Sequence, residues 1–384
     1  MKKLVSVILS AAMIFGCSSV AFAADQTTTQ TAVNVNIPIK LSLDAAYKKV
    51  LADSPGAKMA VLNKKSAEAV SKGYSESVQD LNQLERASKA GEFVSYDPAN
   101  KDMARANRDF ATAQAENNYQ SELNALKTST FENYFKLKDM ENQVILAREN
   151  LALSQKLLSN TQLKLKVGTV SKNDVLKAEM SVTEAQDSLR KASNGLAAMR
   201  MGFNQFMGFN LMQVLSLTDT LKESPMPTKT LQASIGDALK NRNEIVSAKF
   251  DLDMATIYAK TYAAYPTNSA KYLNAQMGIL LADTAYKNAP LTVEKDVRTA
   301  YAAVNDAYTS IQSSNKSVAS AKEAVRLAQL QYDVGMGTLP DVSGAQLGLF
   351  KAQLAQSNAL LEYSLAVDAY NLCSGVGTTP ARIK

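Results

Sequence analysis

The chain contains no histidine and no tryptophan among its 384 residues, and it has only two cysteines. Without histidine, a Ser-His-Asp or Cys-His nucleophile system, a histidine-ligated zinc site and an imidazole proton shuttle are all excluded. No glycine loop with the spacing of a P-loop or a Rossmann fold is present either. We therefore expect no catalytic, cofactor-binding or metal-binding site, and we do not expect an enzyme.

Residues that interrupt helices are also scarce. Nine prolines and sixteen glycines are spread over the whole chain, and long stretches of Ala, Leu, Gln, Glu, Lys and Ser contain neither. This composition predicts long helices and an all-α fold. After the N-terminal segment, no stretch reaches the roughly 18 to 20 apolar residues that a membrane-spanning helix needs.

The first residues have the pattern of a signal peptide. Lys2 and Lys3 precede an apolar run over 4–15, and a small-residue cleavage site follows at 21–23. We expect residues 1–23 to be removed during export. The sequence before Cys17 is also similar to a bacterial lipoprotein site, so lipidation at Cys17 stays open. Otherwise cleavage leaves Cys373 alone, without an intrachain disulfide partner. Because it lies in an apolar run, Cys373 is predicted to be buried.

The charge of the mature chain is small. Removing Lys2 and Lys3 leaves 40 basic residues against 36 acidic ones, a net charge of about +4. This excess is spread along the chain, so it does not indicate a nucleic-acid partner.

A glycine-centred turn occurs twice between long helical segments. Gly335 lies 167 positions after Gly168, and Asp341 lies 167 positions after Asp174. Near the start of each repeat the offset is 188, as between Tyr74 and Tyr262. The first repeat therefore contains 21 extra residues, which we place between 76 and 106. This duplication predicts two antiparallel helical hairpins with matched tips.

These offsets divide the chain into segments. The predicted order is a signal peptide (1–23), an N-terminal extension (24–40), helical repeat 1 (41–208, tip near 167–175), a linker (209–230), helical repeat 2 (231–375, tip near 334–342) and a C-terminal tail (376–384). Within each repeat we expect a helix, a break, a very long helix, the tip and a returning helix.

The last long helix is predicted over about 269–332. A bulky heptad seam runs along it from Val297 to Tyr332, and a second seam of Ala and Ser runs from Ala300 to Ala328, roughly 100° around the helix. Two seams predict two neighbouring helices, as in a curved layer that closes into a tube. An ordinary exposed coiled-coil rod or bundle is the alternative. Pro290 is expected to kink this helix.

The two tips resemble those of the TolC-like outer-membrane efflux channel family. The matching features are the signal peptide, the tandem repeats, the turns over 166–179 and 332–342, and an aromatic residue before a closing glycine at the end of each repeat. In that family, three chains form a twelve-helix tunnel whose turns dock on a periplasmic adaptor protein. The resemblance implies a TolC-like α-barrel protomer and a homotrimer.

The resemblance also implies roles for individual residues. Tip turns and adaptor docking are assigned to Val167, Gly168, Val334 and Gly335, and the entrance or gate is assigned to Asp174, Tyr332 and Asp341. The arginine of the family's closed-state network falls on Gly337, so the familiar latch is in doubt. N-capping of the returning helices is an alternative role for Asp174 and Asp341, and the two roles can coexist.

The sequence departs from the family at the opposite end. Members with a membrane barrel insert two alternating strands per repeat, and residues 73–106 show no such pair. Leu273, Ala275, Met277 and Ile279 alternate with polar or small residues, but the spacing of Leu273, Met277 and Leu280 fits a helix equally well, which we favour. The sequence predicts little or no β-barrel.

The functional expectation is a channel or duct of a tripartite efflux or secretion system, exported to the outer membrane and periplasm. It would pass small molecules passively, with an adaptor (membrane fusion protein) and an inner-membrane transporter as partners. The alternative is an exported coiled-coil scaffold or adaptor that conducts nothing.

Overall fold

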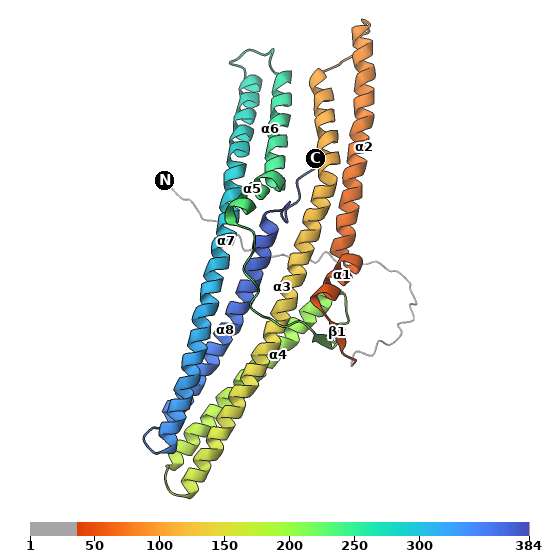
Figure 1. The fold of residues 1–384 in the computed structure, drawn as a ribbon. Helices are drawn as coiled ribbons and strands as arrows, with labels where there is room; N and C mark the ends of the chain where they lie inside the picture. Colours follow the sequence, from red (N-terminus) through yellow and green to blue (C-terminus); the bar gives the residue numbers. More distant parts are fainter. Residues whose placement is uncertain (1–36, 384) are drawn as a thin grey trace.

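The protein is built almost entirely from helices, as the composition predicted. A computed structural model describes residues 37–383, so the expected signal peptide and the lipidation site at Cys17 lie outside the described residues. Figure 1 shows two long helical hairpins lying side by side. In chain order the elements are β1 (Ile39–Leu41), α1 (Leu43–Asp53), α2 (Pro55–Lys89), α3 (Pro98–Lys166), α4 (Lys172–Met207), β2 (Leu215–Leu217), α5 (Leu231–Asn241), α6 (Asn243–Thr261), α7 (Ala270–Asp333) and α8 (Leu339–Cys373).

The two repeats have the same order of helices. Helices α1 to α4 correspond to α5 to α8, and α1 and α5 each have 11 residues. Helix α2 has 35 residues where α6 has 19, and α3 has 69 where α7 has 64. These differences of 16 and 5 residues account for the 21 extra residues of the first repeat. They lengthen the end of the molecule opposite the tips.

Local capping sets where the long helices begin. Asp97 accepts a hydrogen bond from the backbone of Ala99 and Pro98 occupies the first turn of α3, while Ser269 accepts one from the backbone of Tyr272 at the start of α7. Proline fits the first helical turn because it has no N–H to leave unpaired. The start of α7 agrees with the start predicted near residue 269. Helix α7 continues through Pro290.

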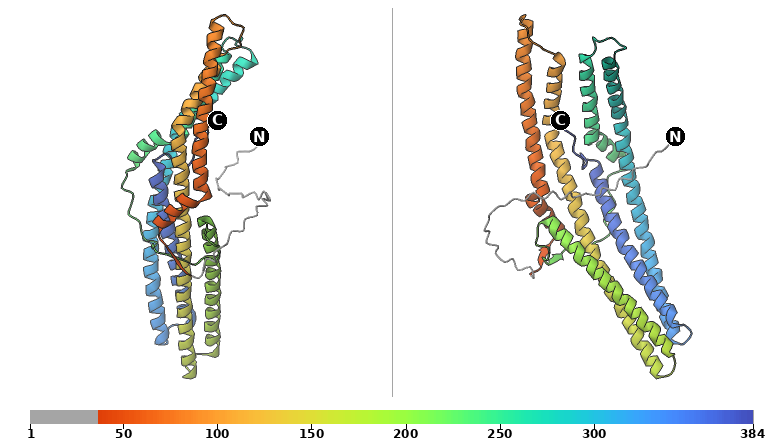
Figure 2. Two further views of the ribbon diagram at one scale, coloured as in Figure 1. Left: turned by 90° about the vertical axis from the view of Figure 1, so that its right-hand side faces the viewer. Right: turned by 180° about the vertical axis from the view of Figure 1, so that it is seen from behind.

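The helices form a layer whose two ends differ in composition. Helices α3 and α7 run almost the whole length, and the other long helices cover half of it (Figures 1 and 2). Toward the two glycine turns, which we call the tip end, the packing order is α4, α3, α8, α7. Toward the opposite end, the distal end, it is α2, α3, α6, α7. Helix α7 is therefore an edge of the layer throughout, and α4 and α2 form the other edge.

The bulky seam of α7 is the core of the second hairpin. Val297, Val304 and Ile311 are completely buried in a cluster with α8, and the ring of Tyr308 lies 5.8 Å from that of Tyr363. The Ala/Ser seam is different because several of its members, including Ala303, Ser310 and Ser317, are exposed. Along part of this seam, the chain therefore provides no second helix to pack against α7.

A small sheet that the sequence analysis missed joins the N-terminal segment to the linker between the repeats. β1 and β2 pair in parallel, with Ile39 opposite Leu215. The hydroxyl of Tyr134, on α3, lies within hydrogen-bond distance of two acceptors, the backbone oxygen of Leu41 (2.9 Å) and Oδ2 of Asp219 (2.8 Å). The predicted N-terminal extension and the predicted linker between the repeats therefore both pack against the middle of α3.

Residues 73–106 are mostly helical, and residues 273–280 are entirely so. Residues 73–89 belong to α2, residues 98–106 to α3 and residues 273–280 to α7. The helical interpretation of Leu273, Met277 and Leu280 is confirmed. None of the helices within 37–383 is both long enough and apolar enough to cross a membrane.

Candidate functional site at the paired helix tips

The first tip ends α3 with a left-handed glycine. Gly168 has φ +80°, a conformation that costs any residue with a side chain. The backbone N–H of Thr169 donates to the oxygen of Lys164 (3.0 Å), and that of Gly168 donates to Leu165 (2.9 Å). This pair of bonds is the Schellman motif, which satisfies carbonyl groups that the end of a helix leaves free.

The second tip repeats this geometry. Gly335 also has φ +80°, Met336 donates to the oxygen of Gln331 (2.8 Å) and Gly335 donates to Tyr332 (3.3 Å). A Cβ atom added at Gly168 or Gly335 would meet nothing within 4 Å. Glycine is thus needed at both tips for its backbone angle, and not for lack of space.

The two predicted entrance aspartates cap the returning helices. Oδ2 of Asp174 accepts from the backbone N–H of Ser171 (2.9 Å) and from its hydroxyl (2.7 Å). Oδ2 of Asp341 accepts from the backbone N–H (2.8 Å) and the hydroxyl (2.6 Å) of Thr338. The capping role given as an alternative in the sequence analysis is therefore present at both tips.

These bonds also set the ionisation of the two carboxyl groups. The hydroxyl and backbone of Ser171 lower the pKa of Asp174, and those of Thr338 lower the pKa of Asp341, because hydrogen bonds to the ionised form favour it. Both carboxylates are charged at neutral pH. In one chain, the tip end therefore carries two fixed negative charges beside the turns.

Apolar side chains project from both turns without a partner in the chain. Val167 is 77% exposed, Val334 is 63% exposed and Met336 is 85% exposed. Exposed apolar groups gathered at one end of a molecule mark an interaction surface better than scattered ones do. The predicted docking residues Val167 and Val334 are placed where a partner can reach them.

Tyr332, in contrast, is buried between the two hairpins. It is 4% exposed and packs in a cluster with Leu157 of α3, Ala178 of α4 and Val342 of α8. Its hydroxyl lies 3.1 Å from Oγ1 of Thr161 on α3. The structure brings Tyr332 to the other hairpin, while Asp174 and Asp341 face outward at the turns.

Lys164 reaches from the first hairpin to the second, which the sequence analysis did not anticipate. Its Nζ donates to the backbone oxygen of Tyr332 (2.6 Å), lies 3.8 Å from the centroid of the Tyr332 ring and 3.7 Å from Oδ1 of Asp333. Gly337, where the resemblance places an arginine in the family, packs instead against the backbone of Tyr332. The cation that joins the hairpins here comes from the first repeat.

A second polar contact joins the hairpins farther from the tips. Asp139 of α3 is 2% exposed, and its carboxylate accepts from Oγ of Ser357 on α8 (2.5 Å) and from Nε2 of Gln143 (2.7 Å). Nδ2 of Asn142 donates in turn to Oγ of Ser357 (2.7 Å). The sequence analysis did not anticipate this contact, because nothing near Asp139 in the sequence identifies Ser357 as its partner.

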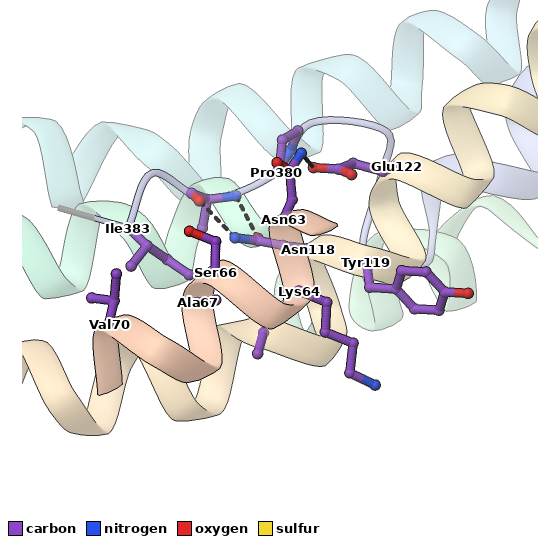
Figure 3. A pocket seen from close by; sticks show the side chains of 12 residues that line it. Asn63, Lys64, Ser66, Ala67, Val70, Asn118, Tyr119, Glu122, Pro380 and Ile383 are labelled. Atoms are coloured by element: carbon purple, nitrogen blue, oxygen red, sulfur yellow. Dashed lines mark hydrogen bonds between the residues drawn. The ribbon is translucent and has the colours of Figure 1, made fainter. Parts of the chain in front are cut away.

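A cavity of about 240 Å³ lies between α2, α3 and the C-terminal segment (Figure 3). Asn118 forms its floor and exchanges two hydrogen bonds with the backbone of Ala381, both of 2.7 Å. The remaining lining includes Ser66, Val70 and Ile383. Asn118 thus fixes the C-terminal segment against α3 at this cavity.

Within 37–383, no three Cys, Asp or Glu side chains are placed to hold a metal ion. Cys373 is free and buried, as predicted, and burial raises the pKa of its thiol. A buried thiol with a raised pKa is a poor nucleophile.

Comparison with known proteins finds a family model that matches part of the chain. The family model described as "Outer membrane efflux protein" matches residues 266–372, which contain α7, the second tip and α8 almost completely. Among curated proteins, no sequence matches the chain.

Solved structures match the fold over most of the chain. The outer membrane protein VceC from Vibrio cholerae is 14% identical with a TM-score of 0.67, and the match covers 88% of this chain and 97% of that one. The open state of the Neisseria gonorrhoeae MtrE outer membrane channel is 16% identical with a TM-score of 0.63, covering 88% and 90%. The outer-membrane channel OprN is 14% identical with a TM-score of 0.64, covering 88% and 90%. At these identities the matches establish the fold.

Proposed function

We propose that the chain is a TolC-like outer-membrane efflux protein, three copies of which form a helical duct through which small molecules leave the cell envelope. The matched family and structures are efflux proteins and channels, and none is described as an enzyme. We place the duct at the outer membrane and periplasm, after export. It supplies no energy, so solutes pass through it passively.

The two unpartnered edges of the helical layer are the observation that carries the proposal. At the tip end, the edges are α7 and α4. Helix α7 exposes members of its Ala/Ser seam, and α4 exposes Leu176 (50%) and Met180 (64%). Small side chains allow a second helix to approach closely, and a cyclic arrangement satisfies both edges with one kind of contact. Three layers of four helices then give a twelve-helix tube.

The tip end is the proposed docking site for a periplasmic adaptor. Val167, Val334 and Met336 are exposed there on two turns with the same backbone geometry. In a trimer these turns would form a ring of six, which suits a partner that surrounds the opening. An adaptor would link the duct to an inner-membrane transporter, which supplies the energy for efflux.

We further propose that Asp174, Tyr332 and Asp341 shape the entrance. Asp341 would form a ring of three carboxylates at the opening, and its hydrogen bonds to Thr338 keep the carboxylate ionised and fixed in place. A ring of negative charge in a narrow pore attracts cations. Tyr332 would act indirectly by holding the two hairpins together through Thr161 and Lys164.

Planar-bilayer recordings of the purified mature chain test this function. The duct should give discrete conductance steps with a preference for cations. Asp341→Asn should reduce that preference, since an amide can still accept the capping bonds but has no charge. Asp187→Asn, an exposed position of α4 in an ion pair with Arg190, is the matched control and should leave selectivity unchanged. Absence of discrete steps, even with an adaptor present, would favour the non-conducting scaffold.

A further inference from the structure

The distal hairpin of repeat two contains no acidic residue. We use this name for residues 254–282, the end of α6, the turn and the start of α7. Between Asp253 and Asp283 the charged side chains are Lys260 and Lys271. The same segment contains four tyrosines, at positions 258, 262, 265 and 272. The functions proposed above do not involve this end of the molecule, which lies opposite the tips (Figure 1).

An apolar stripe is exposed along the start of α7. Leu273 is 51% exposed, Met277 is 59% exposed, and Leu280 and Leu281 are each 65% exposed. Steps of four and three residues place them on one face of the helix. Ala275, which is 3% exposed, lies on the opposite face at 100° per residue and is covered by the protein. We call these four exposed residues the distal stripe.

Tyrosines gather at the turn beside the distal stripe. The hydroxyls of Tyr258 and Tyr262 are 3.1 Å apart, and the rings of Tyr262 and Tyr265 are 5.5 Å apart. Nζ of Lys271 lies 5.1 Å from the centroid of the Tyr265 ring. Tyr258 and Tyr265 remain 49% and 40% exposed. Tyrosine has an apolar ring and a polar hydroxyl, which suits the boundary between lipid and water.

A second copy of the chain is a poor match for the distal stripe. At this end the other edge of the layer is α2, so a neighbour in a ring would present the distal half of α2. Among the described residues, Leu84, 38% exposed, is the one large exposed apolar side chain in that half. Its other exposed residues include charged ones such as Glu76 and Asp80. Packing the distal stripe against this surface would bury the charged side chains of α2 against the leucines of the stripe.

We propose that the distal hairpin of repeat two lies in the headgroup layer of a membrane that contains acidic lipids. The distal stripe faces the acyl chains, the tyrosines lie at headgroup level, and Lys260 and Lys271 attract the anionic headgroups. A helix with one apolar face and basic flanks binds a bilayer in this way without crossing it. The absence of acidic residues removes the repulsion that such lipids would otherwise exert. The proposed duct is the context for this inference, but the lipid contact can be tested separately.

The chain contains no tryptophan, so a single introduced tryptophan can report how deeply the distal hairpin enters the bilayer. Tyr265→Trp introduces a single fluorophore at the turn, and Met336→Trp introduces one at the exposed second tip as a matched control. Each protein is mixed with vesicles of phosphatidylethanolamine and phosphatidylglycerol whose acyl chains are brominated. Emission at position 265 should be quenched and shifted to the blue, and emission at 336 should be unchanged. No quenching at 265, or equal quenching at both positions, would overturn the proposal.

Vesicle flotation identifies the residues that bind. Leu280→Gln with Leu281→Gln should weaken flotation with the same vesicles, without bromine, by about tenfold or more, because two leucines lose their apolar contact. Leu327→Gln with Leu330→Gln, on the same helix at the tip end and 44% and 52% exposed, should have no effect. Unchanged flotation of the first double variant would contradict the proposal.

Two further readouts separate the possible occupants of the distal stripe. Lys260→Gln with Lys271→Gln should weaken binding to the acidic vesicles and leave the weaker binding to phosphatidylcholine vesicles unaltered. If Leu280→Gln with Leu281→Gln instead lowers the mass measured by light scattering while flotation persists, the stripe binds a second copy and the lipid assignment fails. A chain that is quenched at position 265 but does not conduct would refute the duct and leave the lipid contact standing.

Discussion

At the first tip, Gly168 closes a Schellman turn and Asp174 caps the returning helix; at the second tip, Gly335 and Asp341 do the same. The side chains just before the two turns behave differently. Leu165 is half-buried, and the residue 167 positions later, Tyr332, is buried and contacts the first hairpin. The two tips thus have the same backbone geometry, but the side chains before the turns make different contacts.

The turn and the contact between the hairpins therefore depend on the sequence in different ways. The turn depends on residues within one stretch of about ten, so duplication preserves it in both repeats. The contact between hairpins depends on residues that are not equivalent, since Lys164 from one repeat meets Tyr332 from the other. Each repeat supplies one half of a junction, and this asymmetry requires that the two repeats diverged in sequence at these positions.

Removing the Tyr332 ring should produce the largest difference between the tips. Tyr332→Ala is expected to lower the free energy of unfolding by about 3 kcal/mol, because it empties a closed site between four helices. Leu165→Ala, the equivalent position of the first repeat, should cost about 1 kcal/mol, because that side chain is partly solvated. Urea unfolding at one protein concentration measures both values. Equal losses would mean that the tips do not differ in the way described.

The shared backbone predicts equal effects at the two glycines. Gly168→Ala and Gly335→Ala should each cost about 1–2 kcal/mol, since a side chain disfavours positive φ. No neighbouring atom is close enough to add a steric penalty at either site. Gly344→Ala, a helical glycine of α8 with open space around it, should stabilise by about 0.5–1 kcal/mol. Thermal unfolding of the three variants provides the comparison, and clearly unequal costs at the tips would break the symmetry.

A smaller loss of stability is expected when Lys164, the cation between the two hairpins, is replaced. Lys164→Met should cost about 1 kcal/mol, because the Tyr332 ring and its backbone oxygen lose a partly desolvated cation. Lys166→Met, two positions later and exposed, should change stability little. Hydrogen exchange of the second tip measures the local consequence. If both variants open the tip to the same extent, the contact of Lys164 is only a surface interaction.

The capping aspartates should give a weak pH dependence at both tips. The pKa of each carboxyl is lower in the folded protein, so its contribution to stability is present above the unfolded value of about 3.9 and is lost as pH falls below it. Asp174→Asn and Asp341→Asn should each reduce the loss of thermal stability between neutral pH and pH values below that value. A larger dependence after substitution would show that the aspartates do not act as caps.

Most of the fold followed from local patterns. Heptad seams, capping residues and the scarcity of proline and glycine predicted the long helices, and the offsets of 167 and 188 predicted their duplication and the position of the extra residues. The pairing of β1 with β2 was missed because it joins residues separated by more than 170 positions through three-residue strands. Such short strands contribute little periodicity, and only the enclosing residues, such as Tyr134, fix them.

The candidate site was predictable to the extent that it is local. Gly168, Gly335, Asp174 and Asp341 have the backbone or capping roles that their sequence neighbours indicate. Lys164 was not predicted, because nothing near it in the sequence refers to Tyr332. Contacts between repeats depend on the rotation and spacing of whole helices, which a single sequence does not specify.

The central claim is that two matched tips belong to a closed ring of three chains. Static light scattering of the purified mature protein, with and without detergent, tests it most directly. The expected mass is three times that of one mature chain, and Leu176→Gln with Met180→Gln on the α4 edge should reduce it. A monomer under both conditions would contradict the account, because the exposed edges of α4 and α7 would then have no partner.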